Sequence, residues 1–186
     1  MNDIFSGVFS EYAVKRVGIR PDGESDYTIM DGAGTLNDEF EMHTIVKKKS
    51  NITKWQRTRY TGEGTLAVTC HIPLTLLRTI SGRASTGVTG VYGLDTSAVI
   101  VSSEVVVEVE DEDGDIYYKY YPSASLSKNA SEIDSNSDEV AEADLEFALS
   151  ADTNGLPVYD SLSSELDSSL DWMTDASSDN LYAATA

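Results

Sequence analysis

The sequence predicts a mainly β protein, an antiparallel β-sandwich or β-barrel with one short flanking helix and one extended loop. Three observations support this fold class. Several segments alternate apolar and polar residues with the period of a half-buried strand. Asp113-Gly114, a dipeptide favoured in tight β-turns, separates two of these segments. Only one segment carries both a start and a stop signal for a helix. A chain of 186 residues can bury a substantial core in a single domain.

The clearest strand pair lies within residues 101–126. Val105, Val107 and Val109 point to one side of a predicted strand, and Glu104, Glu108 and Glu110 point to the other. We expect a two-residue turn at Asp113-Gly114, which would place Glu108 opposite Lys119, Val109 opposite Tyr118 and Val107 opposite Tyr120. The hairpin therefore predicts an apolar face for the core and an acidic face for water or a partner.

The remaining elements follow in chain order. Alternation predicts strands over residues 11–19, 40–46, 65–70 and 140–150, and in the last of these Leu145, Phe147 and Leu149 oppose Asp144 and Glu146. Pro73 at the start and Gly82 just past the end bracket a helix of about two turns over residues 73–80. Residues 47–63 are basic and polar and predict an extended loop, and residues 127–138 predict a polar loop.

The composition divides the chain into a β domain over residues 1–157 and an acidic, Ser-rich tail over residues 158–186. Within the tail, Leu166, Leu170 and Met173 have helical spacing. Two structures fit this pattern. One is a short amphipathic helix that packs against a partner, and the other is a loosely ordered acidic tail.

Charge is distributed very unevenly along the chain. There are 13 Lys and Arg residues and 32 Asp and Glu residues, which gives a net charge of -19. Residues 1–93 hold 11 basic and 10 acidic groups, whereas residues 94–186 hold 2 basic and 22 acidic groups. So acidic a surface repels nucleic acid, because affinity for a duplex comes largely from cations that replace counterions on phosphate.

The sequence contains no pattern that predicts an enzyme, a metal site or a cofactor. Asp111, Asp113 and Asp115 resemble calcium ligands, but an EF-hand loop with Gly114 at its sixth position would have Val109 as its first ligand. Cys70 and His71 are neighbours on a strand and therefore point to opposite faces. A single cysteine, the absence of an apolar run of about 20 residues and the absence of a secretory signal favour assembly in a reducing cytoplasm.

The order of elements over residues 60–157 resembles a known family. A strand leads into the short helix PLTLLRTI, followed by VYG, a hairpin with EVEDEDGD at its tip, an aromatic return strand and a final strand that ends near DTNG. This pattern resembles the major tail protein, the tail tube subunit, of long-tailed bacteriophages of Gram-positive hosts. The resemblance implies a structural virion protein that forms six-membered rings. These rings stack with each other and with other tail proteins into a tube through which DNA passes.

A tube that conducts DNA needs a lumen without cations, because each Lys or Arg on its wall would attract phosphate. We therefore expect the carboxylates on one face of the sheet to line the lumen. They are Glu104, Glu108, Glu110, Asp144 and Glu146. The alternative is an ordinary solvent-facing side of an antiparallel sheet.

The basic loop predicts a contact with an acidic neighbouring subunit in the next ring, since the C-terminal half of the chain supplies the complementary charge. Trp55 and Tyr60 would be its apolar anchors. The candidate contact residues are Lys47, Lys48, Lys49, Lys54, Trp55, Arg57, Arg59 and Tyr60. A solvated charged loop is the alternative.

A second function class fits the same composition, namely an acidic all-β binding module such as a surface adhesin or a carbohydrate-binding domain. Such a module needs an exposed aromatic platform, for which Tyr117 and Tyr121 are the candidates. Within the first class, the sequence leaves open whether the tube belongs to a phage or to a related injection device.

Overall fold

The computed structural model describes residues 11–49, 52–94, 96–131, 142–166 and 170–183, and within these ranges the side chains of residues 11, 12, 54 and 131 are not described. The fold is mainly β with short helices, which confirms the predicted fold class. Its strands are β1 (Glu11–Pro21), β2 (Thr28–Asp31), β3 (Thr35–Lys49), β4 (Ile52–Cys70), β5 (Arg83–Ser85), β6 (Tyr92–Leu94), β7 (Ser102–Asp111), β8 (Ile116–Ser131), β9 (Ala143–Ser150) and β10 (Tyr159–Leu162). The helical elements are α1 (Leu74–Ile80), the 3-10 turn Ser163–Glu165, α2 (Trp172–Asp175) and α3 (Ser178–Leu181).

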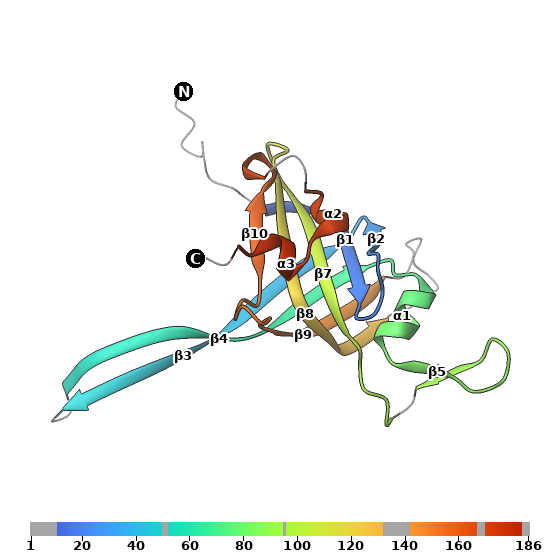
Figure 1. Cartoon of the computed structure of the whole chain (residues 1–186), viewed down its shortest axis with the longest axis horizontal. Coiled ribbons are helices and arrows are strands. Elements are labelled where there is room, and N and C mark those ends of the chain that lie inside the picture. Colours follow the sequence, from blue (N-terminus) through green and yellow to red (C-terminus); the bar gives the residue numbers. More distant parts are fainter. Residues whose placement is uncertain (1–10, 50–51, 95, 132–141, 167–169, 184–186) are drawn as a thin grey trace, which may run out of the picture.

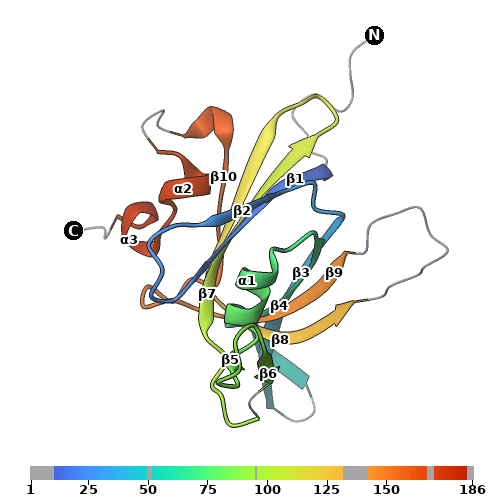
Figure 2. The same ribbon diagram turned by 90° about the vertical axis from the view of Figure 1, so that its right-hand side faces the viewer.

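One antiparallel sheet dominates the molecule, with the strand order β2-β1-β7-β8-β9-β4-β3, and β10 pairs with β8 (Figure 1). Strands β5 and β6 form a separate two-stranded sheet. In the part of the chain that the structure describes, the outer strands β2 and β3 are not hydrogen-bonded to one another, so the sheet is open and not a closed barrel. Figure 2 shows both outer strands of this sheet, β2 and β3, together with helix α1.

The main core lies on one face of this sheet. It contains the predicted inward residues of β4, β7 and β9, together with Ile80 and Leu76 of α1. Val105, Val107, Leu145 and Phe147 are all almost fully inaccessible to water, so the alternation pattern identified the core face of both segments correctly. Helix α1 begins after Pro73 and ends before Gly82, which adopts a positive φ of 64°, as the bracketing residues predict.

The C-terminal residues pack on the opposite face of the sheet, where they bury a second apolar cluster. Val106 and Tyr120 from the sheet contact Trp172, Met173 and Ala176. The predicted boundary at residue 157 therefore does not separate a tail from the sheet, because β10 continues the hydrogen bonding of β8. The residues of the predicted amphipathic helix, so far as the structure describes them, pack against this chain's own sheet, and Met173 is fully buried. Residues 167–169, also part of that prediction, lie outside the described residues.

The register of the β7–β8 hairpin differs from the prediction by one residue. Glu108 pairs with Tyr118 and Val107 pairs with Lys119, whereas a two-residue turn would have paired Glu108 with Lys119. The cause is the buried Asp111 carboxylate, whose Oδ1 accepts hydrogen bonds from the backbone N–H groups of Asp113 (2.9 Å) and Asp115 (2.8 Å). These bonds close a three-residue loop with Gly114 at a φ of 88°, which is the usual form of a hairpin with a G1 bulge.

The basic segment, expected to be an extended loop, is the distal part of a long β-hairpin. Strands β3 and β4 pair from Thr35–Thr69 out to Lys49–Ile52. Strand β4 also pairs with β9, but that pairing ends at Glu63–Ser150, and beyond it β3 and β4 continue alone. We name residues 42–60 the arm. Most of the residues 127–131 that were expected to open a polar loop belong to β8, and residues 132–141 lie outside the described part.

Candidate self-assembly surfaces

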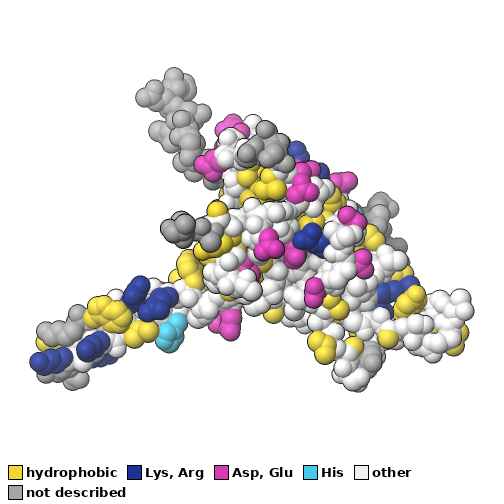
Figure 3. All heavy atoms as spheres, in the orientation of Figure 1, with side chains coloured by type: hydrophobic (Ala, Val, Ile, Leu, Met, Phe, Trp, Pro, Cys, Tyr) yellow, Lys and Arg dark blue, Asp and Glu magenta, His cyan; other side chains and the backbone are white. Residues whose placement is uncertain are grey.

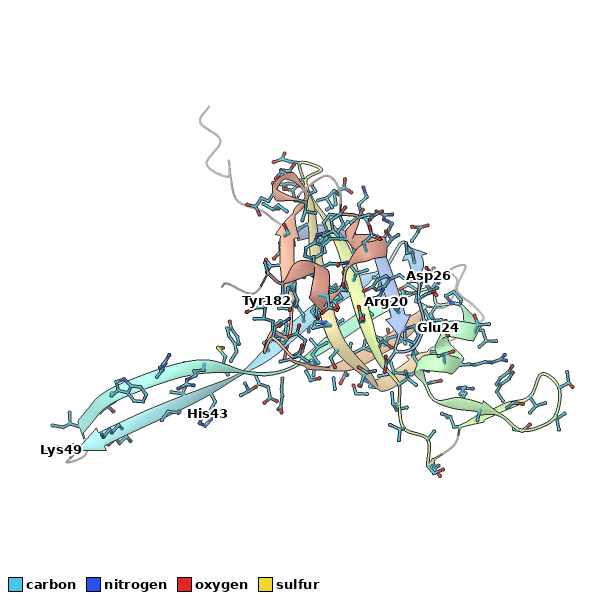
Figure 4. All side chains as sticks on the ribbon, viewed as in Figure 1. Arg20, Glu24, Asp26, His43, Lys49 and Tyr182 are labelled. Carbon is cyan, nitrogen blue, oxygen red and sulfur yellow. The ribbon has the colours of Figure 1, made fainter. Side chains whose placement is uncertain are left out.

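The arm extends away from the body of the molecule along its longest dimension (Figures 1 and 3). It contains six of the chain's 13 basic residues and no Asp or Glu. Lysines and arginines gather on it in Figure 3, whereas the acidic side chains lie on the body. Lys49 lies at its tip and His43 near its root (Figure 4). The arm is thus purely basic, whereas the acidic residues lie on the body together with the remaining basic residues.

The root of the arm is shaped by glycine. At Gly64 an added Cβ would lie 2.4 Å from the backbone oxygen of Glu39, so only glycine lets β3 and β4 approach this closely there. A register shift between Phe40 and Met42 follows immediately, near Gly62 with its positive φ of 86°. Bulges of this kind bend a strand pair and increase its twist. The arm therefore leaves the sheet at a defined point.

The pairing along the arm sorts its side chains onto two faces, because residues directly opposite each other share a face. One face is basic and carries His43, Ile45, Lys47, Trp55, Arg57 and Arg59. The other is uncharged and carries Met42, Thr44, Val46, Gln56, Thr58 and Tyr60. On the uncharged face the hydroxyls of Thr44 and Thr58 are 2.9 Å apart and hydrogen-bonded.

The predicted contact residues are therefore brought together on one element, but not all on one face. Lys47, Trp55, Arg57 and Arg59 share the basic face, while Tyr60 lies on the uncharged face. Lys48 and Lys49 follow a second register shift near the tip. Lys54 lies in β4, and its side chain is outside the described residues. Trp55 and Tyr60 are exposed by 46% and 68%, and although the Tyr60 ring packs edge-on against Phe40, both leave a large apolar area open to solvent.

The five predicted lumen carboxylates lie on two strands of the sheet, β7 and β9, which both pair with β8. On both strands they point away from the main core, since their neighbours Val105, Val109 and Leu145 belong to it. Their surroundings nevertheless differ, and the set divides into a covered group on β7 and an uncovered group on β9.

The covered group consists of Glu104 and Glu108. The Glu108 carboxylate is almost fully buried, forms an ion pair with Arg16, and raises the pKa of that guanidinium mainly through their hydrogen bond. Glu104 Oε2 accepts hydrogen bonds from Arg20 (2.5 Å), from the Tyr27 hydroxyl (2.9 Å) and from the Tyr120 hydroxyl (2.9 Å). These carboxylates are therefore compensated by partners of the same chain.

The Glu104 cluster also holds the C-terminal segment onto the sheet. The Tyr27 hydroxyl lies 2.8 Å and Arg20 Nη2 lies 3.2 Å from the backbone oxygen of Ala176. Burial raises the pKa of the Tyr27 and Tyr120 hydroxyls, and the neighbouring Glu104 charge raises both further. Both hydroxyls thus keep their protons and remain donors.

Glu110 has an intermediate position. Its carboxylate lies 3.3 Å from Lys15 Nζ, and both side chains are partly accessible to water. An exposed pair of this type contributes little to stability but offsets the charge that Glu110 presents.

The uncovered group consists of Asp144 and Glu146 on β9. They belong to a surface that we name the open face, in which the side chains of β3, β4 and β9 opposite the core are small, hydroxylated or acidic. Its members are Thr35, Asn37, Glu39, Glu63, Thr65, Ala67, Thr69, Asp144, Glu146, Ala148 and Ser150. A hollow on this face is lined by Thr35, Thr69, Asp144 and Glu146, and by Lys128 of β8, which pairs with Glu146 in the sheet.

Sequence reasoning missed the contribution of β3 and β4 to the open face. Glu39 alternates with Asp38 and Phe40 on β3, and Glu63 lies just before the alternating segment of β4. The signal that could have found them is the same period-2 pattern that identified Asp144 and Glu146, extended to residues 35–41. It was weak because Asp38 interrupts the apolar set on the core side.

The aromatic platform required for a binding module is not formed by the two predicted tyrosines. Tyr121 is fully buried, and its hydroxyl donates to Asp38 Oδ2 at 3.0 Å. Tyr117 is half-buried and donates instead to Asp160 on β10. The two side chains do not share an exposed surface.

Among the described residues, no group of three or more His, Cys, Asp and Glu side chains is arranged to hold a metal ion. None of the described helices has the length and hydropathy needed to cross a bilayer.

No protein-family model matches the sequence, and no curated protein matches it either. Among solved structures, the chain is similar to a chain in the cryo-EM structure of an extracellular contractile injection system, the PVC sheath–tube complex in the extended state. The TM-score is 0.50, the sequence identity is 6%, and the match covers 87% of this chain and 98% of that chain. At this identity the likeness shows a shared fold.

Two weaker similarities are to cryo-EM structures of the anti-feeding prophage. One is its 6-fold symmetrised baseplate, with a TM-score of 0.46, 11% identity, and coverage of 82% of this chain and 94% of that chain. The other is its tube-terminating cap, with a TM-score of 0.44, 9% identity, and coverage of 88% of this chain and 100% of that chain.

Proposed function

We propose that this chain is a structural, non-enzymatic subunit of a phage-like tail. Copies form six-membered rings, and the rings stack into a tube that conducts DNA within a virion. The observation that carries the proposal is the arm, a basic β-hairpin that extends from an otherwise acidic body. Among the described residues, no basic side chain of the arm forms an ion pair within its own molecule. The body of a second copy carries the opposite charge. The ring size of six follows from the resemblance to tail tube subunits.

The fold adds independent support. The solved chain at a TM-score of 0.50 comes from a sheath–tube complex, and the match spans nearly all of that chain. This likeness also favours a second candidate within the same class, the tube of a contractile injection device in place of the tail tube of a long-tailed phage. The branch from phages of Gram-positive hosts, which the sequence resembles, applies only if the chain forms the tail tube of a long-tailed phage.

The arm contacts the neighbouring ring through its basic face, with Trp55 as the apolar anchor and Lys47, Arg57 and Arg59 around it. Clusters of this composition match the pattern of binding hot spots, in which an aromatic side chain is surrounded by charged groups at the rim. The acidic partner surface comes from the body of the next copy, where exposed acids such as Glu112, Asp113 and Asp115 lie at the β7–β8 tip.

The lumen wall is the open face, with Asp144 and Glu146 as its carboxylates. Glu104 and Glu108 share the sheet face but serve the packing of the C-terminal segment, and Glu110 lies beside Lys15. This wall consists mostly of Thr, Ser, Ala and acidic side chains, and the cation at its hollow, Lys128, lies opposite Glu146 in the sheet, so the wall attracts the duplex only weakly.

Negative-stain electron microscopy of the purified chain tests the function. Uniform hollow tubes, or stacked rings with six-fold symmetry, are the expected result. Persistent monomers at high protein concentration would contradict it. A variant in which an Asn-Gly turn replaces residues 43–59 is expected to stay monomeric and to unfold cooperatively, since the pairing of β4 with the body ends at Glu63–Ser150, before the arm begins.

The lumen assignment has its own test. Asp144→Lys with Glu146→Lys should convert tubes that ignore DNA into tubes that sediment together with short duplex DNA at low salt. The matched control is Asp175→Lys with Asp179→Lys, which adds the same charge on the C-terminal segment. Equal DNA retention by both double variants would show that the open face does not line the channel.

A further inference from the structure

A second surface of the molecule combines exposed apolar side chains with few charged residues. It comprises residues 84–94 and 96–100, which include β6 and most of β5, and we name it the neutral hairpin. It projects from the body on the side opposite the arm (Figure 1). The guanidinium of Arg78 on α1 stacks on the Tyr92 ring at 4.0 Å from its centroid, which ties the hairpin to the helix.

The neutral hairpin exposes aliphatic side chains that a soluble monomer would normally bury. Leu94 is 67% exposed and Val99 is 88% exposed, and three further members are exposed to a large extent, namely Val88, Val91 and Tyr92. Contiguous apolar patches of this kind mark interaction surfaces. Between Arg83 and Glu104 the sequence contains a single charged residue, Asp95.

The charge of the whole chain limits what can cover this surface. Two copies that each carry a charge of -19 repel one another, so they can approach closely only where acidic groups are absent or are compensated. The neutral hairpin meets that condition. So does the uncharged face of the arm, which carries Met42, Val46 and Tyr60 between threonine hydroxyls. Both surfaces expose apolar side chains and carry few charged residues, so little charge must be desolvated when they meet.

We propose that the neutral hairpin of one copy packs against the uncharged face of the arm of a second copy. This inference rests on the proposed self-assembly and names the second surface that it uses. Because the two surfaces lie at opposite ends of one molecule, the contact is head-to-tail (Figure 1). A head-to-tail contact leaves one free surface at each end of a pair, so it continues into rings or filaments. The arm is thus held on both faces, by acidic groups on one and by apolar groups on the other.

Cross-linking between single-cysteine variants tests this contact. Val91→Cys and Thr58→Cys are made separately, with a size-distinguishing tag on one of them, mixed, allowed to assemble and treated with a short bis-maleimide. The native Cys70 does not interfere, because it is fully buried and burial raises the pKa of its thiol to about 11. We expect a cross-linked pair of unlike subunits. Ile45→Cys, next to the partner of Thr58 along β3 but on the basic face, replaces Thr58→Cys as the matched control and should give at least several-fold less product.

The outcomes separate this inference from the proposed function. Tubes that form without a Val91–Thr58 cross-link, or with equal products from Thr58→Cys and Ile45→Cys, overturn the contact and leave the tube intact. Failure of the unmodified chain to assemble overturns both.

Charge placed on the neutral hairpin gives a second readout. Val91→Asp with Leu94→Asp should raise the protein concentration needed for assembly at least tenfold, with an unchanged monomer spectrum. The control is Tyr182→Asp with Ala183→Asp, which adds the same charge at two exposed positions at the C-terminal end of the described chain, far from the hairpin (Figure 4). Equal inhibition by the control would attribute the effect to total charge and overturn the contact.

Discussion

At the scale of single residues, the acidic character of this chain conceals two different uses of carboxylate. Glu104 and Glu108 are structural, since each is held by an arginine beneath the C-terminal segment. Asp144 and Glu146 are more accessible and lie among small polar side chains. Alternation places both groups of carboxylates on the side of their strand that faces away from the main core. It carries no information about which residues cover that side.

Replacement of Glu108 by Gln tests the structural use. The variant leaves Arg16 without its charged partner at a site where the carboxylate is almost fully buried. We expect a loss of about 1–3 kcal/mol in the free energy of unfolding, the range for loss of a buried charged hydrogen-bond partner. Urea denaturation of the monomeric arm-deletion variant measures it without interference from assembly.

Glu110→Gln serves as the matched control for that measurement. Glu110 pairs with Lys15 at a partly exposed site, so its replacement should change the unfolding free energy by less than about 1 kcal/mol. A cost as large as that of Glu108→Gln would show that burial does not distinguish the two glutamates.

At the scale of elements, the sequence predicted strands and the helix better than it predicted their ends. The strands predicted over residues 11–19, 40–46 and 65–70 and the helix predicted over residues 73–80 are present, and the strand predicted over residues 140–150 is present from Ala143 to Ser150. Residues 47–63 were expected to be a loop, since a hairpin with two exposed faces has no apolar periodicity to reveal it. The one-residue register error at β7–β8 came from the Asp111 side chain, whose turn bonds no pattern of hydrophobicity encodes.

The C-terminal segment was mistaken for a tail for a related reason. Its composition is dominated by Ser and Asp, yet Trp172, Met173 and Ala176 supply the apolar contacts. The helical spacing of Leu166, Leu170 and Met173 indicates an apolar face, but it does not tell whether a partner or this chain's own sheet covers that face. The candidate contact residues of the arm could be identified from their charge in the sequence. Their division between two faces could not, because it depends on how β3 pairs with β4.

The root of the arm offers a test at this scale. Gly64→Ala places a Cβ 2.4 Å from the backbone oxygen of Glu39, which cannot rotate away. The strands must separate, and we expect a loss of about 1–3 kcal/mol, typical of overpacking, together with defective tubes. Gly93→Ala is the control for the unfolding measurement, because its added Cβ would meet the Thr86 methyl group at an ordinary 3.5 Å. Unfolding curves of both variants and electron micrographs of Gly64→Ala would decide, and a wild-type result for Gly64→Ala would contradict the close approach.

The attachment of the C-terminal segment should depend on alkaline pH. Burial and then the Glu104 charge raise the pKa values of Tyr27 and Tyr120 above the unperturbed value of about 10. The unfolded chain therefore releases these protons near pH 10 while the folded chain retains them. Stability is fully present below that pH and falls as the pH rises above it.

The measurement for this prediction is the slope of the unfolding free energy between about pH 9 and 11, a range set by the unperturbed tyrosine pKa. Tyr27→Phe with Tyr120→Phe lowers the stability at neutral pH, since two hydrogen bonds to Glu104 are lost, but should flatten the slope. A double variant with the slope of the original chain would assign the alkaline sensitivity to other groups.

At the scale of the whole molecule, charge acts in two opposite ways on assembly. Net charge of -19 drives copies apart over distances comparable to the screening length, whereas the arm's cations attract acidic groups at contact distance. Salt weakens both effects, but not at the same concentration. The screening length is about 30 Å at 0.01 M, about 10 Å at 0.1 M and about 3 Å at 1 M.

Assembly should therefore pass through a maximum as salt is added. From about 0.01 to 0.15 M the long-range repulsion is screened while ion pairs at contact survive, so tubes form at lower protein concentration. Toward 1 M the contact pairs are screened as well, and the required concentration rises again. Sedimentation of tubes across a sodium chloride series measures this dependence.

Arg57→Gln with Arg59→Gln should keep the increase in assembly at low salt and lose much of the decrease in assembly at high salt, because only the decrease depends on the basic face. A decline of equal size in that variant would mean that the arm does not assemble through its cations.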